Sequence, residues 1–332
     1  MKLKLWLSVL VSVVFIWLAF RKINYNELWS GLAKADYIYL LPAILINIVQ
    51  IYLRALRWGY LIEPVKKMGP YNLFSATAIG FMANNILPAR LGEFIKAYAI
   101  GKKESVSVSA SFATIIVERI LDLLTVFIFM FLVFYAVDLP YESAEVEKLL
   151  KYGGGILSLI FLVILILIFY FKNNKELFKN IANKVIKPIS LKAANKMSKF
   201  LDAFASGLSV LKRGKHLIPI TFQSFIIWVL SAVPIYLILI SFGYMLPFSV
   251  SLFILVVLSL AVAIPSAPGF IGTFHYACAL GLGLFNIPEE EALSVAIILH
   301  AISFFPITLI GLYFLWRSNM TLREVENLEE IK

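Results

Sequence analysis

The sequence has little of what enzymes commonly use for metal or covalent chemistry. One cysteine, Cys278, and three histidines are spread over 332 residues, so neither a disulfide framework nor a cysteine-held zinc site is available. A Walker loop, a His-Glu-x-x-His helix and a Gly-x-Ser-x-Gly elbow are also missing. We therefore expect no metal or other cofactor, and we assign no catalytic residue.

Charged residues are scarce, at 15% of the chain, whereas 61% of the residues are hydrophobic and the mean hydropathy is +0.88. Soluble proteins have about 25% charged residues, so the composition predicts a polytopic membrane protein. The net charge of +10 comes mainly from residues 172–216, which hold 11 Lys or Arg and 2 acidic residues. A basic segment between apolar runs is typical of a cytoplasmic loop and gives no indication of nucleic-acid binding.

Six apolar stretches are long enough to cross a bilayer, which takes roughly 20 helical residues. They cover about 3–20, 39–62, 112–137, 152–172, 217–241 and 291–316. The basic segment 172–216 should be cytoplasmic, while the acidic segments 138–150 and 286–291 should be external. This orientation places both termini in the cytoplasm and predicts a multi-pass protein of the cytoplasmic membrane.

Two further apolar regions, 72–100 and 249–285, are broken in the middle by proline and glycine. The apolar segments on either side of each break have roughly 11–17 residues, which is short for a full crossing of the bilayer. We therefore expect each region to be a re-entrant helical hairpin. Each hairpin lies between two spans, which predicts an inverted repeat of about 39–137 and 217–316. The expected fold is one all-α transmembrane domain with six spans, two hairpins and a basic cytoplasmic segment (172–216) that ends in an amphipathic helix.

Arginines occur inside the predicted membrane segments, where charged side chains are costly and usually functional. Arg54 and Arg57 share a helix face one turn apart. Arg90 and Glu93 lie at the first break, where a helix beginning near Gly92 would offer free N–H groups to an anion. Because guanidinium groups grip phosphate oxygens, these residues predict a phosphate site. The structural alternatives are snorkelling of Arg57 to the membrane surface and a simple ion pair at the break.

Glu118 and Asp122 share a helix face four residues apart, where like charges repel unless cations neutralise them. We expect Arg119 to pair with Asp122, and Arg54 or Arg90 to pair with Glu118. A protonated Glu118 is the alternative, because burial raises the pKa of a carboxyl group. A network that only locks the helices together is also consistent with this pattern.

The second break offers Gly269, Gly272, Thr273 and His275, and a helix beginning there could face the first break across the membrane. His300 lies inside the last predicted span. We interpret this lone histidine as a core residue.

Four motifs together resemble a known family: Tyr52–Trp58, Asn84–Glu93, Val117–Asp122 and Pro265–Thr273. This order is similar to the transmembrane region of lysylphosphatidylglycerol synthases, which is associated with moving a charged lipid between leaflets. The resemblance implies a flippase-like membrane protein. The aminoacyl-transferase domain of those synthases is expected to be absent.

The leading hypothesis is a flippase or transporter for a phospholipid or a polyprenyl-phosphate-linked lipid. The alternatives are an intramembrane enzyme or accessory subunit acting on polyprenyl-phosphate lipids, and a scaffold for a separate synthase. The expected partners are lipids with anionic headgroups and a lipid-modifying enzyme, with no nucleic acid. The predicted substrate-binding residues are Arg54, Arg57, Asn85, Arg90, Gly92, Glu93, Glu118, Arg119, Asp122, Pro268, Gly269, Gly272, Thr273 and His275.

Overall fold

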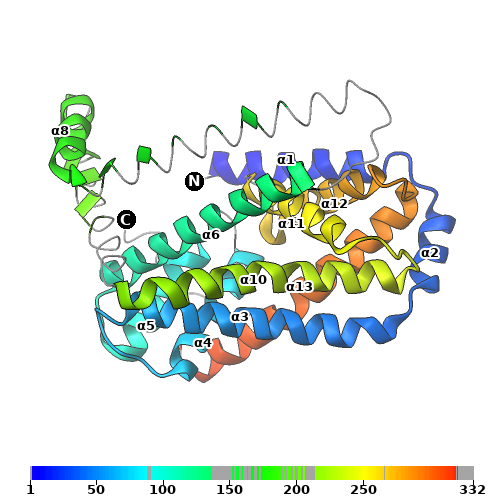
Figure 1. The fold of residues 1–332 in the computed structure, drawn as a ribbon, viewed down its shortest axis with the longest axis horizontal. Coiled ribbons are helices and arrows are strands. Elements are labelled where there is room, and N and C mark those ends of the chain that lie inside the picture. The colour runs from blue at the N-terminus through cyan, green and yellow to red at the C-terminus, as the bar shows by residue number, and fades with distance from the viewer. Residues whose placement is uncertain are drawn as a thin grey trace.

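The computed structural model describes residues 2–87, 91–136, 214–264, 266–318 and 320, with residues 173–188 and scattered positions between 152 and 205. Every element in this part of the chain is a helix (Figure 1). The helical composition agrees with the predicted polytopic membrane protein. The predicted span 152–172 and the amphipathic helix expected after residue 190 lie largely outside the described residues. Helix α8 (Lys175–Ile186) forms part of the basic segment.

Four long helices form the body of the molecule: α3 (Leu40–Ile62), α6 (Val108–Ala136), α10 (Gly214–Ser241) and α13 (Glu289–Arg317). Among the described residues, three stretches are long and apolar enough to cross a membrane: Tyr37–Ile62, Ile218–Ser241 and Glu289–Arg317. They correspond to three of the six predicted spans. The predicted span 112–137 is helix α6, which carries three charged residues in its first half.

The N-terminal region consists of α1 (Lys2–Phe20) and α2 (Tyr25–Lys34). The axis bends by 85° between Val9–Phe20 and Tyr25–Lys34, and the bent pair would provide a fourth crossing if it acts as one span. The sequence predicted a helix over 3–20 but none over the second part. Asn24 caps α2 by accepting a hydrogen bond from Asn26 N, which explains why the helix begins again after the bend.

Each predicted break separates two short helices. The first pair is α4 (Pro70–Ile86) and α5 (Gly92–Glu104), and the second is α11 (Phe248–Ala263) and α12 (Thr273–Gly283), joined through the 3-10 turn η3 (Pro268–Phe270). Within each pair the helices pack against each other. Figure 1 shows the first hairpin in the left part of the molecule and the second in the right part.

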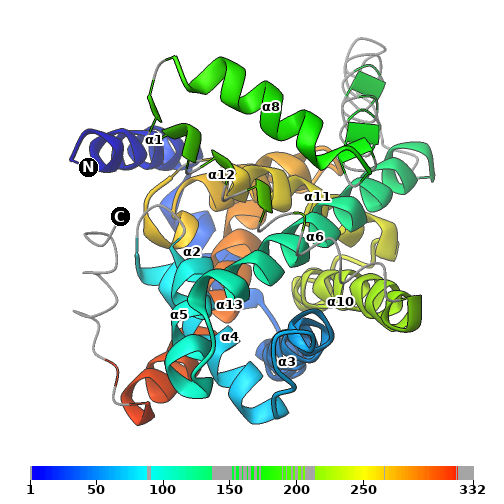
Figure 2. The same cartoon turned by 90° about the vertical axis from the view of Figure 1, so that its left-hand side faces the viewer.

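The two halves of the fold, α3–α6 and α10–α13, are interleaved. Helix α3 packs along α10, α4 packs along α13, and α6 packs against α11. Figure 2 shows α13 among the surrounding helices, with α3 beside α10. The end of α4 also reaches η3, so the two breaks meet inside the molecule.

Small residues allow the first hairpin to close tightly. A methyl group added at Gly92 would overlap the carbonyl oxygen of Gly80 on the facing helix. The N–H of Gly92 donates to Oδ1 of Asn84 at 2.8 Å. One of the free N–H groups expected at this helix start is therefore already bonded within the hairpin.

The second break is held between α1 and α13. Gly269 and Gly272 have φ angles of +71° and +92°, which favour glycine. The backbone N–H of Ala267 donates to Ser12 Oγ on α1 at 2.8 Å, and a methyl group at Gly272 would press on the Ser12 carbonyl. On the other side, His300 Nε2 lies 2.7 Å from the Gly269 carbonyl oxygen.

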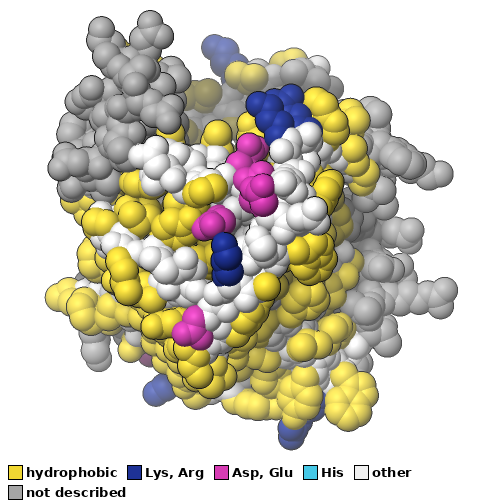
Figure 3. Space-filling model, turned by 90° about the vertical axis from the view of Figure 1, so that its right-hand side faces the viewer, with side chains coloured by type: hydrophobic (Ala, Val, Ile, Leu, Met, Phe, Trp, Pro, Cys, Tyr) yellow, Lys and Arg dark blue, Asp and Glu magenta, His cyan; other side chains and the backbone are white. Residues whose placement is uncertain are grey.

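Charge differs between the two ends of the molecule. Figure 3 shows the end that contains α2 and the start of α13, where acidic side chains and a smaller number of Lys or Arg side chains stand among apolar ones. Glu289, Glu290 and Glu291 begin α13 there. The opposite end carries Lys102 and Lys103 in the last turn of α5 and Arg317 in the last turn of α13. Of the segments on which the predicted orientation rests, the acidic one at 286–291 lies at the first of these ends, and the orientation itself stays a prediction.

Candidate functional site

One face of α3 carries a polar stripe through an otherwise apolar helix. Asn47, Gln50, Arg54 and Arg57 follow at intervals of 3, 4 and 3 residues, a spacing that keeps them on one side of a helix. Because α3 packs along α10 and also contacts α6 and α13, this stripe points into the molecule. Arg54 is 7% exposed and Arg57 is completely buried.

Asp122 of α6 is surrounded by donors. Its Oδ1 lies 2.8 Å from Arg57 Nη2 and accepts a hydrogen bond from Trp228 Nε1 at 3.3 Å. Its Oδ2 lies 3.2 Å from Arg54 Nη1 and 3.3 Å from Arg119 Nη2. The predicted pairing of Arg119 with Asp122 is confirmed.

Glu118, one turn earlier, binds a different set of cations. Its Oε2 lies 2.7 Å from Lys96 Nζ, and its Oε1 lies 3.2 Å from Arg119 Nη2 and 3.4 Å from Arg57 Nη2. Of the two partners expected for Glu118, Arg54 or Arg90, Arg54 forms its ion pair with Asp122 instead. Arg90, the other expected partner, lies outside the described residues.

These six charged residues, which we call the ion cluster, contain more positive than negative charge. Two carboxylates, Glu118 and Asp122, face four cations: Arg54, Arg57, Lys96 and Arg119. Five of the six side chains are at most 9% exposed, and Arg119 is 36% exposed. Uncompensated charge is expensive to bury, so the cluster favours the approach of an anion.

Neutral groups complete the ion cluster. Arg57 Nη1 donates to Ser224 Oγ of α10 at 2.9 Å, which excludes the predicted alternative of snorkelling for this fully buried side chain. Lys96 Nζ lies 4.1 Å from the ring centroid of Trp58, a cation–π contact. The indole of Trp58 donates to Thr114 Oγ1 at 2.9 Å and thereby fixes the ring.

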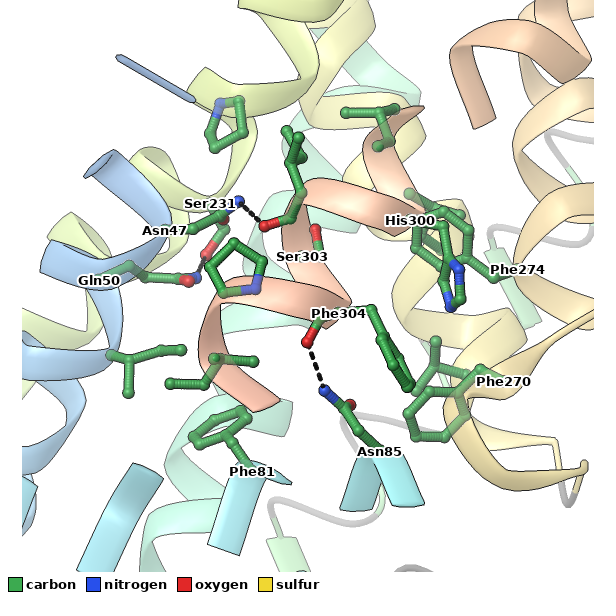
Figure 4. A pocket seen from close by; sticks show the side chains of 18 of the residues that line it. Asn47, Gln50, Phe81, Asn85, Ser231, Phe270, Phe274, His300, Ser303 and Phe304 are labelled. Atoms are coloured by element: carbon green, nitrogen blue, oxygen red, sulfur yellow. Dashed lines mark hydrogen bonds between the residues drawn. The ribbon is translucent and has the colours of Figure 1, made fainter. Parts of the chain in front are cut away.

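A cavity of about 300 Å³ lies next to the ion cluster, between α3, α4, α10, α11, α13 and the second break. Arg54 of the ion cluster and Trp228, which donates to Asp122, both belong to its wall. Asn85 from the first break and Gly269 from the second also line it. The cavity therefore lies where the two halves of the fold and both breaks meet (Figure 4).

One wall of the cavity is polar but uncharged. Asn47, Gln50 and Ser231 lie on this side in Figure 4, and Gln50 Nε2 donates to Ser231 Oγ. Pro306 interrupts the α13 hydrogen-bond ladder and frees the carbonyl of Ile302. Asn47 Nδ2 donates to that carbonyl at 3.4 Å, so part of this polar lining compensates the backbone.

The opposite wall is aromatic. Phe270, Phe274, His300 and Phe304 line it, and Figure 4 shows their rings grouped across the cavity from Gln50. His300 stacks near Phe274 and Phe304, with ring centroids 5.3 and 5.5 Å away. The centroid of His275 is 4.8 Å from that of His300. His300, interpreted above as a core residue, is thus part of the cavity wall.

The remaining predicted residues lie around this centre. Asn85 donates to the Phe304 carbonyl at 3.3 Å and to Thr308 Oγ1 at 2.8 Å. Glu93 accepts from Asn84 Nδ2 at 3.5 Å and is close enough to Arg119 to attract it.

In the second break, Thr273 donates to the Phe270 carbonyl at 3.1 Å. Gly92 and Gly272 serve close backbone packing, and Pro268 begins η3.

Sequence reasoning missed Lys96 in the ion cluster, its hydrogen-bond partners Ser224 and Trp228, and the neutral residues of the cavity wall. Lys96 had a visible signal, since it is a charged residue inside the apolar arm that follows Gly92. The stripe of α3 was equally visible as polar residues spaced like the arginines. Ser224 and Trp228 had no such signal, because both are ordinary residues in a membrane helix.

Comparison with known proteins places the chain in a family. The model of the lysylphosphatidylglycerol synthase TM region matches residues 5–311. A UPF0104 membrane protein of Methanocaldococcus jannaschii is 30% identical over 248 residues, covering 74% of this chain and 97% of the relative. Another from Pyrococcus horikoshii is 27% identical over 331 residues, covering 93% and 96%.

A more distant likeness links part of the chain to a larger protein. The glycosyltransferase AglD of Haloferax volcanii is 30% identical over 122 residues, which is 36% of this chain and 19% of that protein. No solved structure matches the chain. The region matched by the family model, residues 5–311, contains both hairpins and the ion cluster. The chain therefore belongs to the lysylphosphatidylglycerol synthase TM region family of membrane proteins.

Proposed function

We propose that the protein moves a phosphate-containing lipid between the two leaflets of the membrane, with the headgroup passing through the central cavity. One observation carries the proposal: both helix breaks meet at a cavity whose wall includes Arg54, a member of the cation-rich ion cluster. Broken helices around a polar site inside a membrane domain are the common architecture of secondary transporters.

The ion cluster explains the preference for phosphate. Its two carboxylates are already shared among four cations, and Glu93 near Arg119 adds a third negative charge, so an incoming phosphate still meets a surplus positive charge. Guanidinium groups bind phosphate oxygens with two parallel hydrogen bonds. Arg54 is the cluster member that lines the cavity, and we assign it the contact with the headgroup.

The interleaved halves supply a route for alternating access. In the predicted orientation the first hairpin enters from the cytoplasmic side and the second from the external side. Rocking of α3–α6 against α10–α13 would then expose the cavity to each leaflet in turn, while the acyl or prenyl tails remain in the surrounding lipid.

Substitution of Arg54 tests the proposal. Arg54→Gln removes the cavity cation, while Asp122 keeps Arg57 and Arg119 as partners, so the fold should survive. A hydrogen bond to a charged group contributes roughly 1.5–3 kcal/mol, and we expect transport to slow by about tenfold or more. The measurement is translocation of fluorescent anionic phospholipids in proteoliposomes.

Arg317→Gln is the matched control. Arg317 lies at the far end of α13 and donates to Tyr313, so its loss should leave the rate unchanged. Equal rates for the wild type, Arg54→Gln and protein-free liposomes across several anionic headgroups would refute the proposed function.

The alternative of an enzyme or accessory subunit acting on polyprenyl-phosphate lipids is favoured by the position of His300. Its ring faces the cavity beside His275, where it could serve as an acid or base. The partial likeness to a glycosyltransferase agrees with either an enzyme or a carrier of lipid-linked sugar. Product formation by the purified protein from polyprenyl phosphate and a sugar nucleotide would support the enzyme.

A further inference from the structure

The charges around the central cavity restrict which headgroup it accepts. Among the described residues that line it, Arg54 is the single Lys, Arg, Asp or Glu, so the described wall contains no carboxylate. An ammonium group that enters the cavity loses its hydration, and a carboxylate partner would offset that loss more strongly than cation–π contacts with the aromatic wall. The wall as described provides no such carboxylate.

The carboxylates behind the wall are already occupied. Asp122 contacts Arg54, Arg57 and Arg119, and Glu118 contacts a second trio of cations that includes Lys96. A lysyl ester of a phospholipid would bring two ammonium groups and one phosphate into this positive environment. Repulsion from the surplus cations therefore opposes a cationic aminoacyl headgroup.

The neutral wall suits hydroxyl groups. Amide and hydroxyl side chains both donate and accept hydrogen bonds, as do the hydroxyls of sugars and glycerol. Asn47, Gln50 and Ser231 provide such groups along one side of the cavity, and Ser303 provides another on α13. Bonds from Asn47 to Ile302 and from Gln50 to Ser231 use part of this capacity. The aromatic wall opposite offers flat apolar surfaces to the C–H face of a sugar ring. A volume of about 300 Å³ is at the lower end for small-molecule sites, which suits one headgroup unit.

We propose that the cavity selects a phosphate-linked, uncharged polyol headgroup, such as a hexosyl phosphate or a glycerol phosphate, and rejects cationic aminoacyl headgroups. The inference rests on the proposed function, because it names the cargo of the same site. Arg54 and the ion cluster hold the phosphate, the neutral wall bonds the hydroxyls, and the aromatic wall packs against the carbon skeleton.

Binding measurements test this selection independently of transport. The detergent-solubilised full chain is titrated, by native mass spectrometry, with phosphatidylglycerol, a polyprenyl-phosphate hexose and lysylphosphatidylglycerol. We expect the two polyol lipids to bind at least about tenfold more tightly than the lysyl lipid. Equal or tighter binding of the lysyl lipid would overturn the inference.

A charge-switch variant makes the test sharper. Gln50→Glu introduces a carboxylate into the wall one helical turn before Arg54, where the two side chains can pair. The binding ratio of polyol lipid to lysyl lipid should fall by about tenfold or more. Asn26→Asp adds the same charge on the exposed surface of α2 and should leave the ratio unchanged. If Gln50→Glu does not fold, Ser303→Asp serves as the test variant instead, because it places a carboxylate at another point of the cavity wall. The same fall in the binding ratio is expected.

The outcomes separate the inference from the proposed function. Selective binding without translocation in proteoliposomes would refute the transporter and support the selectivity. Translocation that favours the lysyl lipid would refute the selectivity alone. Binding of glycerol 1-phosphate or hexose 1-phosphate as tight as that of the lipids would identify a site for soluble phosphates and overturn the lipid assignment. Absence of binding by every probe would overturn both proposals.

Discussion

Asp122 is the residue on which the ion cluster most depends. Replacement by alanine would leave Arg54, Arg57 and Arg119 crowded around a missing carboxylate. Breaking a buried ion pair by removing one partner is destabilising by about 3–5 kcal/mol. We therefore expect Asp122→Ala to lower the midpoint of thermal unfolding in detergent strongly.

The control for this prediction lies in the basic segment. Asp202 pairs with Lys175 and Lys179, and its side chain is 44% exposed, so these ion pairs are largely screened by water and contribute little. Asp202→Asn should leave the unfolding midpoint unchanged. A shift for Asp122→Ala no larger than that for Asp202→Asn would show that the ion cluster does not hold α3 and α6 together.

The charged residues of the site could largely be predicted from the sequence, whereas their partners could not. Arg54, Glu118 and Asp122 stand out because charge is rare in apolar helices. Which cation meets which carboxylate depends on how far each helix is rotated about its axis, and that depends on packing across the whole bundle. For this reason the sequence left the partner of Glu118 open between Arg54 and Arg90, and the pairing of Arg54 with Asp122 and the contact of Trp228 were not foreseen.

At the scale of elements, the close approach of α4 and α5 depends on Gly92. A methyl group there overlaps the Gly80 carbonyl and the side chain of Asn84, so Gly92→Ala must push the two helices apart. Overpacking of this kind costs roughly 1–3 kcal/mol. We expect a lower unfolding midpoint and slower transport, measured in detergent and in proteoliposomes.

Gly283 in α12 is the matched position for this comparison. A methyl group there meets no atom within 4 Å, so Gly283→Ala should be neutral or slightly stabilising. Normal stability and transport of Gly92→Ala would contradict the view that tight closure of the first hairpin shapes the cavity.

Both helix breaks could be predicted because proline and glycine mark them directly in the sequence. The meeting of the two breaks at Asn85 and Gly269 was an expectation from their opposite orientation. Helix α2 was not predicted, since its short, weakly apolar segment follows a basic pair and reads as a loop. The re-entry of the hairpins into a membrane, six spans and the inverted repeat stay predictions.

At the scale of the whole molecule, the orientation in the membrane can be tested by labelling. Cys278 is completely buried, so the native chain should give little background with a membrane-impermeant maleimide. Glu289→Cys and Lys67→Cys place exposed thiols at opposite ends of the molecule. In intact cells we expect the reagent to label Glu289→Cys and to reach Lys67→Cys only after lysis. The reverse pattern would invert the predicted orientation.

The members of the ion cluster are distributed unequally between the two halves. All six charged side chains come from α3, α5 and α6, whereas α10 contributes the Ser224 hydroxyl and the Trp228 indole. Sliding of α10 past α3 and α6 would therefore break these two hydrogen bonds to charged groups, each contributing roughly 1.5–3 kcal/mol, together with the Gln50–Ser231 bond, and would leave the ion pairs intact. The six charged side chains can therefore move together as a rigid unit, so a phosphate bound to them need not be released while α10 slides past α3 and α6.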